Sequence, residues 1–213
     1  MTTAAWGLLG LTLLIAVVDW VAVVTDNRTV EYVCKPATMV ALIGMVLALT
    51  PHTPHLRLWF VVALVCSLAG DVFLMLPQDL FVPGLVSFLL GHLAYVVGLL
   101  SAFQSLPLLG VGIVLVVVGI TVVLPRLLPG AQAEAPELVK PVVGYVLVIS
   151  LMVVSAWGTA TALAILGAML FFASDATLAW NRFVHEYPKG RLLVMTTYHL
   201  GQIGLALSLV SLG

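Results

Sequence analysis

Long runs of hydrophobic residues, separated by short polar segments, fill almost the whole chain. An apolar window of about 17 to 25 residues is long enough to cross a bilayer core of about 30 Å as an α-helix. Eight such windows lie at approximately 4–24, 36–50, 57–76, 83–103, 108–125, 140–157, 159–180 and 192–212. The pattern therefore predicts an all-α, polytopic membrane protein with eight transmembrane helices in a single transmembrane domain, residues 1–213.

Composition supports this interpretation. Hydrophobic residues make up 62% of the 213 residues and charged residues only 8%, whereas soluble domains carry about 25% charged residues. The net charge is -1 and no basic run is present, so we expect membrane lipid and no nucleic acid among the partners. The first window lacks a basic segment before it, and we interpret it as a retained span and not a cleaved signal.

The positive charges predict the orientation. If the eight windows cross the membrane alternately, seven of the eight Lys and Arg residues fall on one side: Arg28, Lys35, Arg126, Lys140, Arg182, Lys189 and Arg191. The other side holds Arg57. Since short cytoplasmic loops carry the excess of positive charge, we expect 25–35, 77–82, 126–139 and 181–191 in the cytoplasm and both termini outside it. A multi-pass protein of a cell membrane, such as the bacterial inner membrane, is the expected localisation.

An internal repeat is also indicated. The matched positions are Lys35-Pro36, Asp71 and His92 in the first half, and Lys140-Pro141, Asp175 and His199 in the second. The Lys-to-Asp separations are 36 and 35 residues. Because four helices separate the copies, the halves would share one orientation, related by an axis along the membrane normal. We predict a two-fold duplication of a four-helix unit, with repeats 1–106 and 107–213.

Ionisable residues lie inside the apolar windows. A charge at membrane depth costs roughly 2.5 to 3.5 kcal/mol and marks a candidate functional site. With a rise of about 1.5 Å per residue, we place Asp19, Asp71 and Asp175 about 9 Å deep, His199 about 10 Å and His92 about 13 Å, all from the predicted cytoplasmic side. With Lys35 and Lys140 at its rim, this set predicts an acidic, histidine-containing cavity that opens toward the cytoplasmic leaflet.

Each of these residues also has a structural interpretation. Interfacial acids beside an aromatic anchor are ordinary, and buried histidines donate to neighbouring helices. Lysines at helix ends are topology determinants, and a buried acid can belong to an interhelical salt bridge. The interfacial position applies to Asp19 and the buried hydrogen bond to His92 and His199. The topology role applies to Lys35 and Lys140, and the salt bridge to Asp71 and Asp175.

Several segments resemble the YhhN family of eight-helix membrane proteins, which includes the lysoplasmalogenases. They are GDVFLML, FVPGLVSFLLGHLAYV, FFASDATLAWNRF and YHLGQ, together with the Lys-Pro that opens the second window. The resemblance implies an integral membrane hydrolase without a bound cofactor. It would split the vinyl ether bond of a lysophospholipid substrate, a lysoplasmalogen, into a fatty aldehyde and glycerophosphoethanolamine or glycerophosphocholine.

The resemblance implies Asp71 and Asp175 as catalytic residues, with His92, Tyr198 and Gln202 lining the site. Vinyl ether hydrolysis begins with protonation of an alkenyl carbon, and two acids in different environments suit that chemistry. The full set of predicted substrate-binding residues is His92, Tyr95, Tyr198, His199, Gln202, Lys35, Lys140 and Asp19, the lysines holding the substrate phosphate.

Two other functions fit the same residues. Asp71, Asp175, His92 and His199 are adequate ligands for a zinc or manganese ion in a metal-dependent lipid hydrolase. A duplicated bundle with buried acids also describes a proton-coupled carrier. Our first expectation is acid–base catalysis with no metal and no cofactor.

Overall fold

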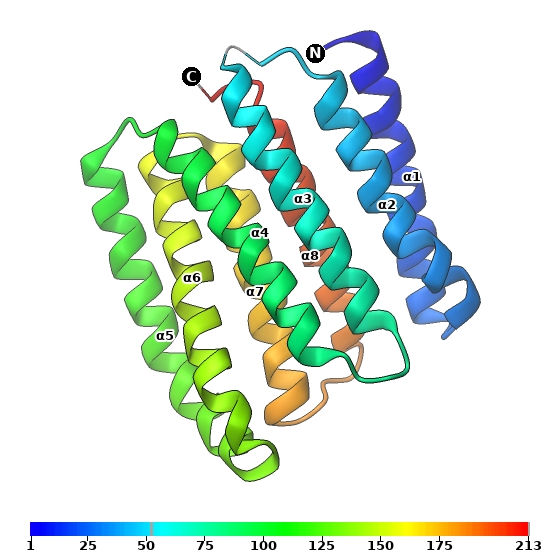
Figure 1. Ribbon diagram of the computed structural model, residues 1–213, viewed down its shortest axis with the longest axis vertical. Helices are drawn as coiled ribbons and strands as arrows, with labels where there is room; N and C mark the ends of the chain where they lie inside the picture. The colour runs from blue at the N-terminus through cyan, green and yellow to red at the C-terminus, as the bar shows by residue number, and fades with distance from the viewer. Residues whose placement is uncertain (52, 213) are drawn as a thin grey trace.

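The protein is an all-α bundle in the computed structural model, which describes residues 1–51 and 53–212 (Figure 1). The helices run alternately up and down, and the two termini lie at the same end of the bundle. The elements are α1 (Thr3–Val24), α2 (Arg28–Ala48), α3 (Pro54–Met75), α4 (Phe81–Ser101), α5 (Leu106–Glu134), the 3-10 helix η1 (Pro136–Leu138), α6 (Val139–Gly158), α7 (Ala162–Phe183) and α8 (Gly190–Ser208).

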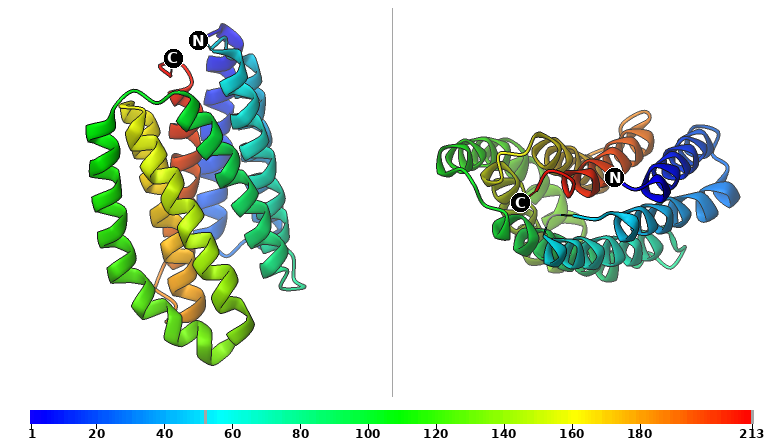
Figure 2. Two further views of the ribbon diagram at one scale, coloured as in Figure 1. Left: turned by 60° about the vertical axis from the view of Figure 1, so that its left-hand side comes forward. Right: turned by 90° about the horizontal axis from the view of Figure 1, so that it is seen from above.

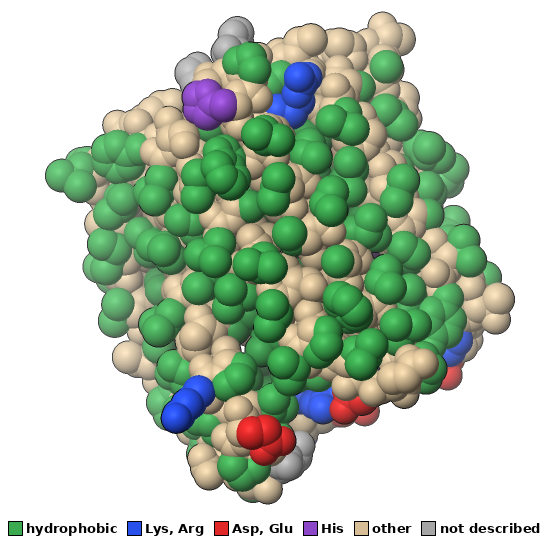
Figure 3. Space-filling view, in the orientation of Figure 1, with side chains coloured by type: hydrophobic (Ala, Val, Ile, Leu, Met, Phe, Trp, Pro, Cys, Tyr) green, Lys and Arg blue, Asp and Glu red, His purple; other side chains and the backbone are tan. Residues whose placement is uncertain are grey.

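The prediction of eight long helices is confirmed, and seven of them are long and apolar enough to cross a membrane. The exception in the described part of the chain is α8, whose centre carries Tyr198, His199 and Gln202. These polar side chains are buried against other helices, so the lower hydropathy of α8 reflects polar groups that point into the bundle. Figure 3 shows apolar side chains across the middle of one face and most of the charged ones along its lower edge.

Two helices extend beyond the predicted windows. Helix α2 begins at Arg28 and continues through Pro36, and the side chain of Asn27 caps it by accepting a hydrogen bond from the Val30 amide. Helix α5 continues through Pro125 and Pro129 to its end. Hydropathy located the apolar centre of each helix, but the polar and proline-containing turns at the ends are helical too.

Consecutive helices pack as hairpins, α1 with α2, α3 with α4, α5 with α6 and α7 with α8. Contacts of α4 with α6, of α2 with α3 and of α1 with α8 join the hairpins. From above the bundle is elongated, with α5 at one end and α1 and α2 at the other (Figure 2). The loops rich in Lys and Arg lie at one end of the bundle, but which end faces the cytoplasm stays a prediction, as does the duplication.

Helices α7 and α8 approach each other closely at glycines. A Cβ atom on Gly167 would lie 2.6 Å from the Leu205 nitrogen and 2.8 Å from the Gly201 oxygen. Small residues allow such backbone approach between membrane helices. The contact sets the distance between the two helices that carry Asp175 and Tyr198.

Replacing Gly167 by alanine is expected to destabilise the folded protein by about 1 to 3 kcal/mol, the usual cost of overpacking. The neighbouring atoms are backbone and cannot move aside as a side chain would. Thermal unfolding in detergent measures the change. Gly110→Ala is the control, because a Cβ atom there meets nothing within 4 Å and alanine is the better helix former. Equal melting temperatures for the two variants would contradict the close packing.

Candidate active site

A polar cavity of about 400 Å³ lies between α2, α3, α7 and α8, at the end of the bundle that carries the Lys- and Arg-rich loops. Four residues singled out in the sequence line it: Lys35, Asp71, Asp175 and Tyr198. Its other charged lining residues are Arg28, Glu31, Arg182, Glu186 and Arg191. Both predicted catalytic acids therefore face one cavity with a strongly charged mouth. We call it the polar cavity.

Asp71, on α3, is 1% exposed and has a partner for each carboxylate oxygen. The Tyr198 hydroxyl donates a hydrogen bond of 2.6 Å to Oδ2, and the Lys35 ammonium lies 3.3 Å from Oδ1. The Lys35 side chain is only 12% exposed. A carboxylate at this depth needs a compensating charge, and Lys35 supplies it.

Asp175, on α7, has partners of a different kind. The Tyr145 hydroxyl donates a hydrogen bond of 2.5 Å to Oδ2. His92 Nε2 lies 3.3 Å from the same oxygen and 2.9 Å from the Tyr145 hydroxyl. Because the Tyr145 proton is directed at Asp175, Nε2 must itself carry a proton to bond to either oxygen. His92 is fully buried and thus reaches the cavity only through Asp175.

Tyr145 was not singled out in the sequence. It lies on α6, is 8% exposed and packs against the His92 ring with a centroid distance of 5.2 Å. The one available signal was a tyrosine inside an apolar window, since a buried hydroxyl usually finds a hydrogen-bond partner. Which partner it finds depends on the contact of α6 with α4, which no local pattern specifies.

Changing Tyr145 to phenylalanine is expected to lower the rate of any reaction that uses Asp175 by about ten-fold, because the hydrogen bond that positions the Asp175 carboxyl is lost while the ring stays in place. We assign Tyr145 a positioning role, so the pH profile of the rate should shift together with kcat. Steady-state kinetics across pH measures both. Tyr187→Phe is the control, because Tyr187 is 44% exposed in the α7–α8 connection. A Tyr145→Phe protein with the wild-type rate and pH profile would refute this role.

Three of the predicted binding residues pair with other buried groups and do not line the polar cavity. The Tyr95 hydroxyl donates to Gln202 Oε1 at 2.6 Å, and both side chains are fully buried. His199 Nδ1 accepts a hydrogen bond of 3.1 Å from the Trp20 indole. These contacts join α4 and α1 to α8, so they place α8 and, with it, Tyr198.

Asp19 and Lys140 also lie outside the polar cavity lining. Asp19 is fully buried, and neither carboxylate oxygen has a hydrogen-bond partner among the described residues. Lys140 is exposed near the start of α6, with no ion pair to a described carboxylate. The two lysines matched in sequence thus have different surroundings, and a phosphate-binding role for Lys140 stays a prediction.

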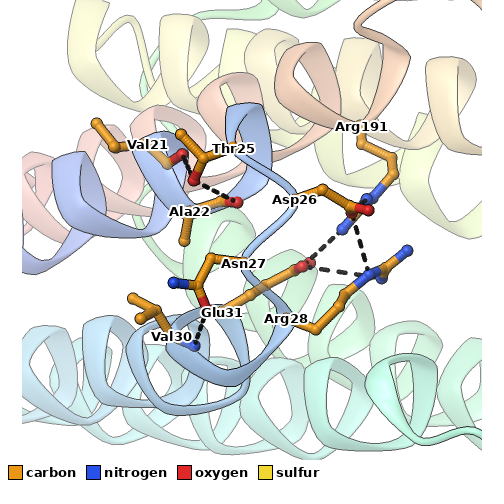
Figure 4. Close-up of polar contacts among 9 residues, drawn as sticks. All are labelled: Val21, Ala22, Thr25, Asp26, Asn27, Arg28, Val30, Glu31 and Arg191. Atoms are coloured by element: carbon orange, nitrogen blue, oxygen red, sulfur yellow. Dashed lines mark hydrogen bonds and ion pairs between the residues drawn. The ribbon is translucent and has the colours of Figure 1, made fainter.

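An ion-pair cluster stands at the mouth of the polar cavity (Figure 4). Arg191 lies 2.9 Å from Asp26 and 2.6 Å from Glu31, and Arg28 lies 3.8 Å from Glu31. Helix α8 is tied in this way to the α1–α2 connection. In the sequence Arg28 and Arg191 were only topology signals, but both side chains line the cavity.

A second pair joins the α3–α4 connection to the last turn of α7. Arg182 donates to both carboxylate oxygens of Asp79 at 2.9 Å. These hydrogen bonds hold the pKa of the Asp79 carboxyl below its ordinary value. A lowered folded-state pKa contributes stability above the unfolded pKa and loses it as the pH falls. Because the Asp79 side chain is 66% exposed, that contribution is small.

The four residues considered as metal ligands do not form one group. Asp71 contacts Lys35 and Tyr198, His199 contacts Trp20, and His92 contacts Asp175. Across residues 1–51 and 53–212, no three His, Cys, Asp or Glu side chains converge to hold a metal ion. The geometry gives the metal-dependent alternative no support.

Comparison with known proteins agrees with the resemblance seen in the sequence. The chain is 36% identical over 149 residues to lysoplasmalogenase TMEM86B of Homo sapiens, covering 68% of this chain and 61% of that protein. It is 34% identical over 158 residues to lysoplasmalogenase TMEM86A of Bos taurus, covering 70% and 64% respectively. The matches thus span about three fifths of the relatives' length, and no solved structure matches. The YhhN family model matches residues 30–209, so the chain belongs to the YhhN family.

Proposed function

We propose that this protein is a membrane-embedded hydrolase that cleaves the vinyl ether bond of lysoplasmalogens. The products would be a fatty aldehyde and glycerophosphoethanolamine or glycerophosphocholine. One observation carries the proposal: Asp71 and Asp175 line one cavity but have different partners. Asp71 lies beside the Lys35 ammonium, and Asp175 accepts a hydrogen bond from the Tyr145 hydroxyl. The relatives named lysoplasmalogenases support it.

The reaction needs one proton, one water molecule and a stabilised cation. A proton adds to the alkenyl carbon remote from the ether oxygen, and the other carbon becomes an oxocarbenium ion. Water adds to that carbon and loses a proton, which gives a hemiacetal. The hemiacetal hydroxyl then loses its proton as the bond from that carbon to the ether oxygen breaks and the leaving oxygen takes a proton, so that aldehyde and alcohol separate. The steps together consume one water and restore the protein's protons.

The surroundings of the two acids suggest which proton-transfer step each of them performs. Asp71 lies beside the ammonium of Lys35 and accepts from Tyr198, an arrangement that stabilises a carboxylate. In our scheme it faces the oxocarbenium ion and takes the proton of the attacking water. Asp175 accepts from Tyr145 and lies beside His92, and in our scheme it delivers the proton to carbon. Acid–base catalysis of this kind contributes typically about 10² to 10⁴-fold.

The charged mouth suits a zwitterionic head group. Arg28, Arg182 and Arg191 offer donors for a phosphate, and Glu31 and Glu186 offer carboxylates for an ammonium group. The mouth lies at the same end as the positively charged loops. We therefore propose, from the positive-inside rule, that the substrate enters from the cytoplasmic leaflet.

The test compares two lysolipids that differ at one bond. Purified protein in detergent receives a lysoplasmalogen or its ester-linked analogue of the same chain length and head group. We expect aldehyde release from the lysoplasmalogen alone. Folded, monodisperse protein that releases no aldehyde, or that cleaves the ester equally well, would contradict the proposed function.

A further inference from the structure

A second hollow, the apolar crevice, adjoins the polar cavity. Its walls come from α3, α4, α5, α6 and α7, and every lining side chain is hydrophobic except Asp175. The only hydroxyl among them is that of Tyr145, which donates to Asp175. The crevice and the polar cavity share four lining residues, namely Leu74, Phe88, Asp175 and Leu178. Asp175 therefore lies at the boundary between a charged space and an apolar one.

This boundary matches a feature of one class of lipid. A single-chain ether lysolipid changes from polar to apolar at its ether bond, with the glycerophospho-alcohol on one side and the hydrocarbon chain on the other. A molecule that places its head group among Lys35, Arg28 and Arg191 and its chain in the apolar crevice brings the ether bond to Asp175. The opposite placement would bring hydrocarbon against the charged groups of the polar cavity and remove water from them, which is costly.

The crevice is narrow. Its free volume is about 60 Å³, compared with about 400 Å³ for the polar cavity. On the same scale one water molecule needs about 10 to 15 Å³, so only a slim segment of a few carbons fits without movement of the walls. Phe88, shared by both hollows, packs edge-on against Tyr198 and Phe171, with ring centroids 5.8 Å and 6.2 Å apart, which restricts widening on that side.

We infer that the apolar crevice is a chain subsite, which binds the first carbons of one unbranched hydrocarbon chain of a lysophospholipid and thereby holds the ether bond at Asp175. The inference rests on the proposed function for its reacting bond. Lipid tails are as apolar as the crevice walls, so the subsite gains little by removing the chain from water. Its contribution is to orient the substrate, because the reaction is much slower when the vinyl ether bond is misplaced relative to the catalytic groups.

The first test fills the crevice. Ala176 lines it, and Ala176→Phe is expected to lower kcat/KM for a straight-chain lysoplasmalogen at least about five-fold, the smallest factor that overpacking usually produces. Ala173→Phe is the matched control, since Ala173 lies on the same helix, is exposed and does not line the crevice. Equal rates for the two folded variants would overturn the inference.

The second test widens the crevice, in case the bulky variant folds poorly. Val146 lines it, whereas Leu147 is 59% exposed outside it. The wild type should prefer a straight chain to one with a methyl branch beside the vinyl ether. Val146→Ala should reduce that preference at least about five-fold, and Leu147→Ala should leave it unchanged. A preference that is absent in the wild type, or that Val146→Ala does not alter, would count against the subsite.

Binding separates this inference from the proposed function. A radiolabelled 1-O-alkyl lysophosphocholine has the same head group and chain but no vinyl ether to cleave. If Ala176→Phe weakens its binding and Ala173→Phe does not, the subsite stands even if no lysoplasmalogen is hydrolysed. If aldehyde is released but both variants bind the alkyl lipid like the wild type, the proposed function stands and the subsite is refuted.

Discussion

Replacing Asp175 or Asp71 by asparagine is expected to lower the rate of aldehyde release by at least about 10²-fold, the usual loss when a general acid or base is removed. Asparagine keeps the size of the side chain and its acceptor oxygen but cannot give up or take a proton. At Asp175 the hydrogen bond from Tyr145 would survive, so the local structure should change little.

A purely structural role makes a different forecast. Breaking the buried Asp71–Lys35 pair costs about 3 to 5 kcal/mol of stability in either case, but with a purely structural role the loss of activity would be no greater than the loss of folded protein. Thermal unfolding and turnover are therefore measured on the same detergent-purified samples. Glu137→Gln, at an exposed carboxylate of η1, is the control for the carboxylate-to-amide change. Normally melting Asp71→Asn and Asp175→Asn proteins with near wild-type rates would rule out catalysis by these acids.

Replacing Lys35 by methionine is expected to destabilise the folded protein by about 3 to 5 kcal/mol, because Asp71 would keep a buried charge without its partner. The Lys35 ammonium lies 3.3 Å from Asp71, and the two side chains are 12% and 2% exposed. Adding Asp71→Asn should restore much of that stability, since the unpaired charge disappears with it. Chemical denaturation of the wild type, both single variants and the double variant gives the coupling free energy.

Lys140→Met provides the comparison for Lys35. Lys140 is exposed and has no described carboxylate within ion-pair range, so its loss should change stability by no more than about 0.5 kcal/mol. Additive effects of Lys35→Met and Asp71→Asn would show that the pair does not form. A large loss for Lys140→Met would instead favour equivalent lysines in the two halves, as the predicted duplication implies.

The number of helices and the end that gathers the charges could be predicted from the sequence. Both follow from local properties, since apolar length marks a span and polar loops separate the spans. The positions of Asp71 and Asp175 near one end of their helices were also accessible, because they follow from helical rise along a known window. Placing both acids toward the same end of the bundle required only the alternation of helix directions.

The partners of the two acids were decided by the tertiary structure. Lys35 pairs with Asp71, whereas the hydrogen-bond partners of Asp175 are Tyr145 and His92 and not Lys140. Hydrophobic periodicity shows which face of a helix points inward only when another face is polar. In a membrane bundle both lipid-facing and interior faces are apolar, so the rotation of each helix about its axis is set by packing, such as the Gly167 contact of α7 with α8. Those rotations turn Tyr198 toward Asp71 and turn Gln202 toward Tyr95.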